Sequence, residues 1–415
     1  MTSPRPILTI ADACALIGEA GFGVRPRGVG LELEWFVTRD GLPVTETTVI
    51  RRAIEDHGPL PHGSRVTFEP GGQLEISAPP STTGPEALRV AEMDTAAVMQ
   101  RLADAGMRCV AIGLDAGGAR PRVIDEPRYR AMAQYFSTRG SAGAAMMRST
   151  ASLQINVGFR DDAETQWDLA HDLAPILAAV FAHSPVVAGQ PSGWQSSRLA
   201  VWHALDPDRT RPVASKTDRR NSWTRYALNA PVMLIHRDGA CTVPEPDLTL
   251  REWIANGHPL GYPTAHDVEY HLTTLFPPIR PRGWLELRMI DALPHPWSQV
   301  AAAVCITALS DPTVGHALEP IVHGCRDLWL TAAWRGVHDP TIGATADAVM
   351  VVIVPALARA GYDPATVAAA YEFADRYPRR RRSLADDRLE AWAAGGVLTP
   401  DPEPIPQSAA RPPIQ

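Results

Sequence analysis

Four short segments of the chain alternate polar with apolar residues, and this alternation constrains the fold more than any other feature. Side chains of a β-strand point alternately to its two faces, so residues two positions apart share a face. In LELEW, Glu32 and Glu34 therefore share one face, while the leucines and the tryptophan share the other. The polar pairs of the four segments are Glu32 and Glu34, Glu69 and Glu75, Gln154 and Asn156, and Glu286 and Arg288. The pattern predicts an antiparallel sheet with one apolar and one polar face.

The polar face has an unusual composition. A face that only contacts water usually mixes lysine, threonine and serine, and a wet face remains the alternative for any one segment. Here the acidic groups are all glutamates, which would raise one another's pKa values if they were packed together. Mg²⁺ or Mn²⁺ would relieve that repulsion, because both ions prefer oxygen ligands and Mg²⁺ is commonly shared with phosphates. Glu69 and Glu75 are therefore predicted to face metal, provided that the two glycines between them cause no net shift of face. Arg288, on the same polar face as Glu286, is suited to clamp a phosphate.

Hydrophobic periodicity places further elements around these segments. The predicted helices cover residues 7–20, 85–106 and 163–183, and the predicted strands cover 28–38, 65–79, 149–160 and 283–290. The strand at 65–79 is expected to be broken or bulged at Gly71 and Gly72. Residues 190–250 are expected to be rich in loops, and 297–395 to form four or five helices without a strand. We predict one catalytic domain over residues 1–395, with its sheet over about 28–295 and a helical part over about 296–395. The proline-rich residues 396–415 are predicted to be a disordered tail.

Composition bears on the partners and the location of the protein. A net charge of −7 argues against a nucleic-acid surface. Lys216 is the only lysine, so phosphate handling must rely on arginine and metal. Five cysteines without CxxC spacing indicate reduced thiols. We find no signal-peptide pattern and no apolar run near the roughly 18 residues of a membrane span, so we expect a cytoplasmic protein without a membrane partner.

Six longer blocks of the sequence carry a family resemblance. In chain order they are GLELEWFV, FEPGGQLEISAPP, MMRSTASLQINVGF, FAHSPVVAGQPSGWQSSRLAVWHALDPDRT, YALNAPVM and YHLTTLFPPIRPRGWLELRMIDALP. They extend from about residue 28 to about residue 300, and they resemble the glutamate–cysteine ligases of plant and proteobacterial type. Within that family, the chain is most similar to the actinobacterial branch that makes γ-glutamylcysteine for ergothioneine.

The resemblance implies both a fold and a reaction. The implied fold is α+β and similar to the catalytic domain of glutamine synthetase, with a curved antiparallel sheet and helices on its outer face. The implied reaction uses ATP to phosphorylate the γ-carboxylate of L-glutamate, after which the amine of L-cysteine displaces phosphate to give γ-glutamylcysteine. Phosphorylation supplies the activated acyl group that amide formation in water requires, and metals with arginine stabilise the transferring phosphoryl group. ATP and Mg²⁺ are the implied cofactors, with Mn²⁺ as a substitute.

The resemblance also assigns roles to single residues. The implied metal ligands are Glu32, Glu34, Glu69, Glu75 and Glu286. Arg288 and Glu69 are the candidate catalytic residues, and Gln154, Asn156 and Arg288 are the candidate contacts to the nucleotide. Arg148, Arg198, Trp202 and Tyr226 match positions that line the amino-acid pocket, although Trp202 and Tyr226 taken alone could equally be core aromatics.

Three alternatives stay open at the level of sequence. One is a ligase of the same mechanism with a different amine acceptor, the second is a binding protein that has lost catalysis, and the third is a two-metal hydrolase. The intact set of glutamates argues against the binding protein, which has no need of every group on the polar face. We expect small-molecule substrates only, and a monomer or a small homo-oligomer.

Overall fold

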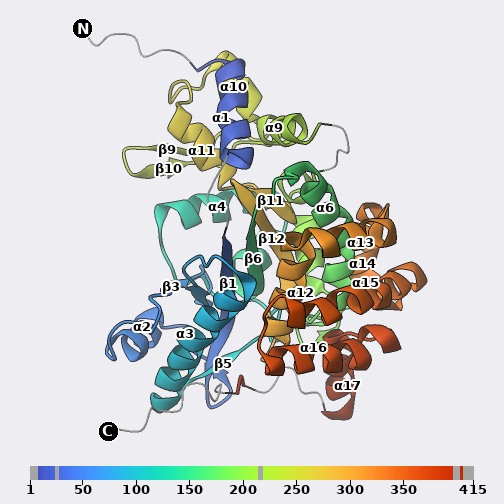
Figure 1. The fold of residues 1–415 in the computed structure, drawn as a ribbon. Helices are drawn as coiled ribbons and strands as arrows, with labels where there is room; N and C mark the ends of the chain where they lie inside the picture. The colour runs from blue at the N-terminus through green and yellow to red at the C-terminus, as the bar shows by residue number, and fades with distance from the viewer. Residues whose placement is uncertain (1–7, 24–27, 214–217, 396–401, 405–415) are drawn as a thin grey trace.

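The computed structural model describes residues 8–23, 28–213, 218–395 and 402–404. Its central sheet has the strand order β11-β12-β6-β1-β4-β3, and each of these pairings is antiparallel (Figure 1). The strands are β1 (Val29–Arg39), β3 (Arg65–Phe68), β4 (Leu74–Ser77), β6 (Ser152–Gly158), β11 (Ile279–Pro281) and β12 (Trp284–Asp291). β2 (Leu42–Pro43) and β5 (Arg108–Val110) pair with the far end of β1. The predicted antiparallel sheet is confirmed.

Helices cover the apolar face of the sheet. α3 (Gly84–Asp104), α6 (Ala163–Val180) and α12 (Trp297–Ser310) share one buried cluster with sheet residues such as Leu31, Leu153 and Leu287. Five further helices lie on or beside this layer: α13 (Pro312–Val322), α14 (Trp329–Arg335), α15 (Pro340–Arg359), α16 (Pro364–Arg376) and α17 (Leu384–Gly395) (Figure 1). The predicted α+β class with helices on the outer face is therefore confirmed.

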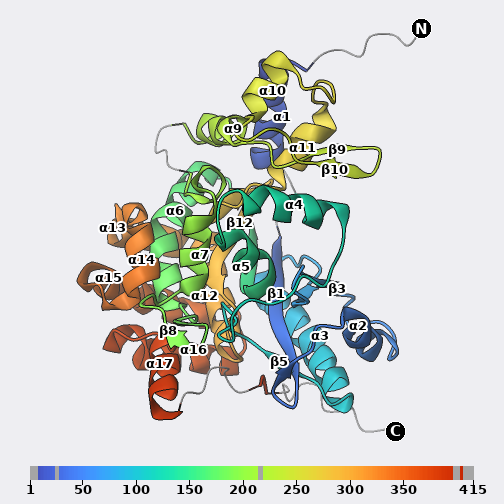
Figure 2. The same cartoon turned by 180° about the vertical axis from the view of Figure 1, so that it is seen from behind.

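The remaining elements surround the polar face and one end of the sheet. α4 (Pro127–Ser137), α5 (Ala142–Ser149) and α7 (Ser197–Leu205) belong to the polar side (Figure 2), and α8 (Pro207–Thr210) contacts α7. α1 (Ile10–Phe22), α9 (Arg219–Asn229), α10 (Leu250–Asn256) and α11 (Ala265–Leu272) gather at one end with the hairpin of β9 (Ile235–Arg237) and β10 (Ala240–Thr242) (Figures 1 and 2). α2 (Thr47–Glu55) packs on α3, and β7 (Val186–Val187) pairs with β8 (Gln190–Pro191).

The segment predicted as one interrupted strand at 65–79 is a hairpin. β3 and β4 pair with each other, and residues 69–73 form the turn between them. The turn is closed by hydrogen bonds from the Glu69 amide to the Gln73 carbonyl (2.9 Å) and from the Gly72 amide to the Glu69 carbonyl (2.8 Å). Gly72 has φ +84°, a conformation that side chains disfavour, and this lets the chain reverse rather than bulge. Glu69 therefore lies in the turn and Glu75 on a strand.

Two expectations about helix content need correction. The region 190–250 was expected to be loop-rich, yet it holds α7, α8, α9 and the start of α10 between its loops. Each of these helices begins at a side chain that accepts a hydrogen bond from a backbone amide of the first turn, namely Ser196, Asp206, Asp218 and Thr249. Such N-cap residues are visible in the sequence and indicate where a helix starts. Among the described residues, 297–395 form six α-helices rather than four or five, with three short 3₁₀ turns at Cys325–Leu328, Gly336–His338 and Pro378–Arg380.

Within the residues that the structure describes, one helix has the length and apolarity expected of a membrane span, although no apolar run of that length was predicted. This helix is α15 (Pro340–Arg359), and half of its apolar window is buried against the rest of the protein. Core helices of soluble proteins meet the same criterion, so a single partly buried helix is weak evidence for a membrane. The absence of a membrane partner stays a prediction.

The domain boundaries also stay a proposal. One cluster of buried apolar side chains runs from Ala13 through the sheet to Leu384, and this continuity supports a single domain. The predicted disordered tail lies outside the described residues except for 402–404. In that short piece, Glu403 is 6% exposed, its amide donates to the Cys109 carbonyl (2.8 Å), and its carboxylate accepts from the His295 amide (2.8 Å).

We expect the docking of Glu403 to weaken as pH rises from about 4.5 to about 8. Burial raises the pKa of Glu403 from its usual 4.5 to about 8, so docking is most favourable when the carboxyl is protonated, and its contribution is lost as pH rises through the folded value. Amide hydrogen exchange at His295 should therefore accelerate by more than the intrinsic rate between about pH 4.5 and pH 8, and should follow the intrinsic rate above pH 8. In Glu403→Gln, the exchange rate at His295 should follow the intrinsic rate at every pH. Equal acceleration in the wild type and the variant would show that ionisation of Glu403 is not the cause.

Candidate active site

Strand register places most of the polar positions in one row across the sheet. Glu75 on β4 lies opposite Glu34 on β1, and Glu32 on β1 lies opposite Gln154 on β6. The row continues from Asn156 on β6 to Glu286 on β12 and Arg280 on β11. Cross-strand partners point to the same face of a sheet. The alternation seen in separate segments thus produces one continuous polar surface.

A cavity of about 230 Å³ lies on this surface. It is lined by nine of the twelve predicted site residues, namely Glu32, Glu34, Glu69, Glu75, Gln154, Arg198, Trp202, Glu286 and Arg288. The other lining residues are Gln73, Arg128, Tyr129, Met132, Met146, Thr150, Ser152, Thr273, Phe276, Arg280 and Arg282. Carboxylates and arginines therefore share one concave site.

Glu34, Glu69 and Glu75 form an acidic cluster in this cavity. Glu34 is 8% exposed and accepts hydrogen bonds from the Ser152 amide (2.8 Å) and from Gln154 Nε2 (3.0 Å). Burial, and next the charge of Glu75, raise the pKa of Glu34. Burial, followed by the charges of Glu34 and Glu75, raises the pKa of Glu69 well above its usual range. Glu34 and Glu69 thus resist ionisation at this position, which is the conflict that a divalent cation relieves.

The donor set of this cluster fits Mg²⁺ or Mn²⁺, because the cluster offers carboxylate oxygens only. Among the residues that the structure describes, however, no group of three or more His, Cys, Asp or Glu side chains is arranged to hold a metal ion. Cation binding would thus have to draw the carboxylates closer together, and the predicted metal site stays a proposal.

Glu286 is neutralised by arginines, unlike the acidic cluster. Arg280 pairs with it through both Nε and Nη2 (2.9 Å for Nη2), and Arg288 Nη1 lies 3.1 Å from the same carboxylate. Burial alone would raise the pKa of Glu286, but Arg280 and Arg288 outweigh it and lower the pKa to about 2. Glu286 is therefore ionised and already paired, so its predicted role as a metal ligand requires exchange of an arginine partner.

Two arginines in the cavity have buried guanidinium nitrogens that find no hydrogen-bond partner within the described part of the chain. Arg288 Nη1 donates to Gln154 Oε1 and to Glu286, whereas its buried Nε has no partner among the described residues. Arg198 donates through Nη2 to the Arg288 carbonyl (2.7 Å), and its buried Nη1 likewise lacks a hydrogen bond, although Asp291 lies 3.7 Å away as an ion-pair partner. Unsatisfied guanidinium groups at a cavity wall are suited to bind carboxylate or phosphate.

Three predicted residues do not line the cavity. Asn156 is on the polar face, but it is engaged by Glu32 (3.1 Å) and by Trp284 Nε1 (2.8 Å). Arg148 donates to the Ala144 carbonyl of its own helix (3.2 Å). Tyr226 on α9 is 6% exposed and stacks on Trp223, with ring centroids 5.6 Å apart, so it belongs to the core.

Several lining residues were missed by sequence reasoning, and some of them carried a signal. Ser152 is two residues before Gln154 on the same strand, so alternation alone placed it on the polar face. Gln73 lies within the EPGGQ block, between Glu69 and Glu75. Arg128 and Tyr129 come from α4, whose position over the sheet no local pattern reveals.

Solved structures share this fold. A glutamate–cysteine ligase of Francisella tularensis in complex with AMP matches with a TM-score of 0.56, at 12% identity, over 91% of this chain and 86% of that one. A bifunctional glutathione synthetase of Pasteurella multocida matches with a TM-score of 0.53, at 15% identity, over 93% of this chain, which spans 52% of that longer protein. The chain therefore shares the fold of these two proteins.

Comparison with known sequences shows the family to which the chain belongs. The family model of glutamate–cysteine ligase family 2 matches residues 28–394. The glutamate–cysteine ligase EgtA of Mycolicibacterium smegmatis is 36% identical over 405 residues, which are 95% of this chain and 94% of that protein. The chloroplastic glutamate–cysteine ligase of Brassica juncea is 31% identical over 250 residues, 57% of this chain and 48% of that protein. The chain belongs to the glutamate–cysteine ligase family, as its sequence blocks predicted.

Proposed function

We propose that this enzyme joins the γ-carboxylate of L-glutamate to the amine of L-cysteine, with ATP converted to ADP and phosphate. The observation that carries the proposal is the family match over residues 28–394, because this range includes every residue that lines the cavity. The similarity to the actinobacterial branch further supports a place for the product, γ-glutamylcysteine, in ergothioneine biosynthesis. Cytoplasmic location and a monomeric or small homo-oligomeric state stay predictions.

The arginine side of the cavity suits the transferring phosphoryl group. In the proposed first step, a γ-carboxylate oxygen of glutamate attacks the terminal phosphorus of ATP, giving an acyl phosphate and ADP. Negative charge is spread over the phosphoryl oxygens during this transfer, and catalysis relies on positioning and on charge stabilisation. The guanidinium of Arg288, next to Gln154 and in reach of the cavity, is the proposed stabiliser.

The acidic cluster is the proposed location of the cation. Bound Mg²⁺ would neutralise phosphate oxygens of ATP. Glu34, Glu69 and Glu75 would hold it, Glu32 would support them from the same face, and Glu286 would stay with its arginines. Among the described residues, Glu34 and Glu69 form no ion pair, although the charge of Arg198 near Glu34 and those of Arg288 and Arg128 near Glu69 partly offset the rise of their pKa values.

The proposed second step is attack of the cysteine amine on the acyl phosphate, which forms the amide bond and releases phosphate and a proton. Arg198 and Trp202 line the cavity together, and the unsatisfied Nη1 of Arg198 is suited to hold an amino-acid carboxylate. Holding both amino acids by their charged groups places the amine against the reacting carbonyl carbon.

The products formed from a pool of amino acids test this proposal. Incubation with ATP, Mg²⁺, L-glutamate and the twenty amino acids should give γ-glutamylcysteine, ADP and phosphate in equal amounts. Another γ-glutamyl product would identify a different acceptor amine. AMP with pyrophosphate would contradict the acyl-phosphate route, and phosphate release without either amino acid would indicate a hydrolase.

A further inference from the structure

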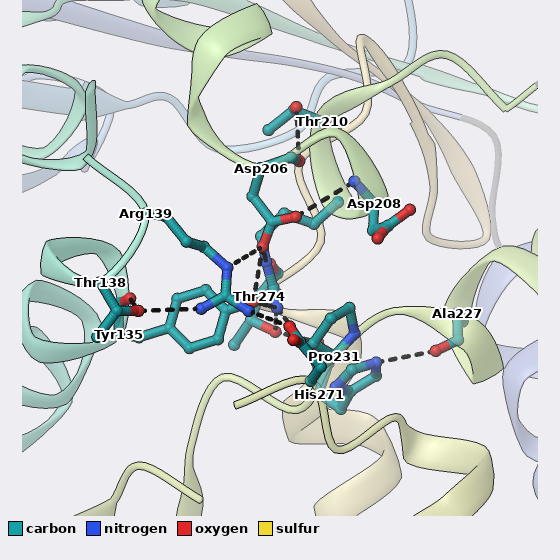
Figure 3. Close-up of polar contacts among 12 residues, drawn as sticks. Tyr135, Thr138, Arg139, Asp206, Asp208, Thr210, Ala227, Pro231, His271 and Thr274 are labelled. Atoms are coloured by element: carbon teal, nitrogen blue, oxygen red, sulfur yellow. Dashed lines mark hydrogen bonds and ion pairs between the residues drawn. The ribbon is translucent and has the colours of Figure 1, made fainter. Parts of the chain in front are cut away.

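A buried cluster centred on Arg209 lies beside the cavity, outside the residues assigned so far. Arg209 is fully buried, and each of its five N–H donors meets an acceptor. These acceptors are Asp206 Oδ2 (2.9 Å), the Thr274 carbonyl (2.8 Å), Thr274 Oγ1 (3.2 Å), Tyr135 Oη (2.8 Å) and the Pro231 carbonyl (2.6 Å). Figure 3 shows Tyr135, Asp206, Thr274 and Pro231 converging on one centre. A fully satisfied, buried guanidinium fixes the backbone segments that it joins.

The hydroxyl of Tyr135 connects the two charges of the cluster. It donates to Asp206 Oδ2 (2.6 Å) while accepting from Arg209. Burial would raise the pKa of Asp206, but Arg209 and the Tyr135 hydroxyl outweigh it and lower the pKa, so the pair is ionic. Arg139 adds a second cation, with Nε 3.5 Å from Asp206 and Cζ 3.8 Å from the centre of the Tyr135 ring. The cluster is thus a rigid joint between α4 and α8.

The cluster holds two segments that form one wall of the cavity. Tyr135 is near the end of α4, the helix that carries Tyr129 and Met132 into the cavity. Thr274 belongs to the segment after α11, from which Thr273 and Phe276 line the same cavity. At the rim, Arg128 on α4 donates to Thr273 Oγ1 (3.0 Å), so the two segments also meet directly.

Phe276 connects the cluster to Arg288. The Phe276 amide donates to the Arg209 carbonyl (2.7 Å), which fixes the start of the side chain. Its ring packs edge-on against Trp202 with centroids 5.5 Å apart, and Arg288 Cζ lies 5.8 Å from the Phe276 ring and 5.9 Å from the Trp202 ring. A shift of the Arg209 backbone would therefore move Phe276 and, through it, the guanidinium of Arg288 at the cavity wall.

We propose that Tyr135 and Arg209 are positioning residues for the ligase reaction, holding Phe276, and through it Arg288, at the wall of the cavity. This inference rests on the proposed function, because it assigns the effect to the phosphoryl-transfer step. A small misplacement of a charge-stabilising group slows the chemical step more than it weakens substrate binding. The cluster should therefore influence kcat more than KM.

Tyr135→Phe tests the proposal by removing one oxygen atom. The matched control is Tyr377→Phe in the outer helical layer, where a buried tyrosine hydroxyl also donates to an aspartate, Asp387 (2.8 Å), that arginines share. Tyr135→Phe removes two buried hydrogen bonds and Tyr377→Phe removes one, so Tm should fall by about 4 °C and about 2 °C, respectively. Only Tyr135→Phe should reduce kcat, by about tenfold, with KM values for ATP, glutamate and cysteine within threefold of wild type.

A second measurement separates failure of this inference from failure of the proposed function. Hydrogen exchange in 127–137 and 273–278 should accelerate in Tyr135→Phe and stay unchanged in Tyr377→Phe, whatever reaction the enzyme catalyses. Faster exchange with unchanged kcat would overturn the positioning role, and unchanged exchange would overturn the joint itself. If wild type makes no γ-glutamylcysteine, the proposed function has failed, and exchange still decides whether the joint exists. If Tyr135→Phe does not fold, Thr274→Val removes another acceptor of Arg209, and the same outcomes apply.

Discussion

Replacing Arg288 with lysine is expected to lower kcat by roughly 10²–10³, with much smaller changes in the KM for glutamate and cysteine. Lysine keeps the charge but loses the forked geometry that a phosphoryl group engages through two donors. The loss should match that of one preorganised transition-state contact. Steady-state kinetics with each substrate varied in turn measure it.

The structure weakens the alternative that Arg288 only neutralises Glu286. Arg280 already pairs with that carboxylate through two nitrogens, and Arg288 contributes a single contact of 3.1 Å. If Arg288 served only to balance charge, Arg288→Lys would have near-normal kcat, and Arg288→Ala would lose thermal stability instead. Arg326→Lys is the matched control, because Arg326 pairs with Asp172 through two nitrogens (2.6 and 2.9 Å) outside the cavity and should change Tm without changing kcat.

Replacing Glu69 with glutamine is expected to reduce activity by about 10²-fold and to weaken activation by Mg²⁺, while the protein without metal becomes more stable. Burial and the charges of Glu34 and Glu75 raise the pKa of Glu69 in the folded state. A carboxylate whose pKa is raised in the folded state destabilises the fold at any pH above its usual pKa of 4.5. The gain in Tm of Glu69→Gln should therefore be present at pH 8 and vanish below about pH 4.5. Melting curves at both pH values, with and without Mg²⁺, measure these effects.

The control for this prediction is Glu403→Gln. Glu403 is also a buried carboxyl with a raised pKa, but it lies on the opposite side of the sheet, next to His295. Its replacement should also increase stability at pH 8, yet leave the stabilisation by Mg²⁺ intact. If Glu69→Gln destabilised the protein and kept normal Mg²⁺ activation, Glu69 would have a structural role and no part in metal binding.

The site was predictable from sequence where it depends on local stereochemistry. Alternation in a strand placed Glu32 and Glu34 on one face, and the register of the sheet confirmed that they join Gln154 and Glu75 there. The strand assignment failed at Glu69, because Gly72 turns the chain at φ +84° and converts one expected strand into a hairpin, although Glu69 still lines the cavity together with Glu75. Hydrophobic periodicity predicted a helical region beyond residue 297 but not the number of its helices. The short turns between these helices are apolar like the helices, so the pattern does not show where one helix ends and the next begins.

Similarity of sequence blocks did not show which side chains reach the cavity. Arg148 and Arg198 both lie in family-like blocks, yet Arg148 bonds to its own helix and Arg198 points into the cavity. Tyr226 likewise lies in such a block and stacks in the core. The rotamer and partner of a long side chain depend on neighbours that are distant in sequence, so block similarity cannot decide them.

The sequence by itself determined the family, the antiparallel sheet and the polar character of one of its faces, because side-chain alternation and local motifs act over a few residues. Only the tertiary structure decided that Arg280 neutralises Glu286, that Glu34, Glu69 and Glu75 have no ion-pair partner among the described residues, and that α4 lines the cavity. These properties are electrostatic and steric. They depend on distances between segments separated by tens to hundreds of residues, and those distances exist only when the whole chain is packed.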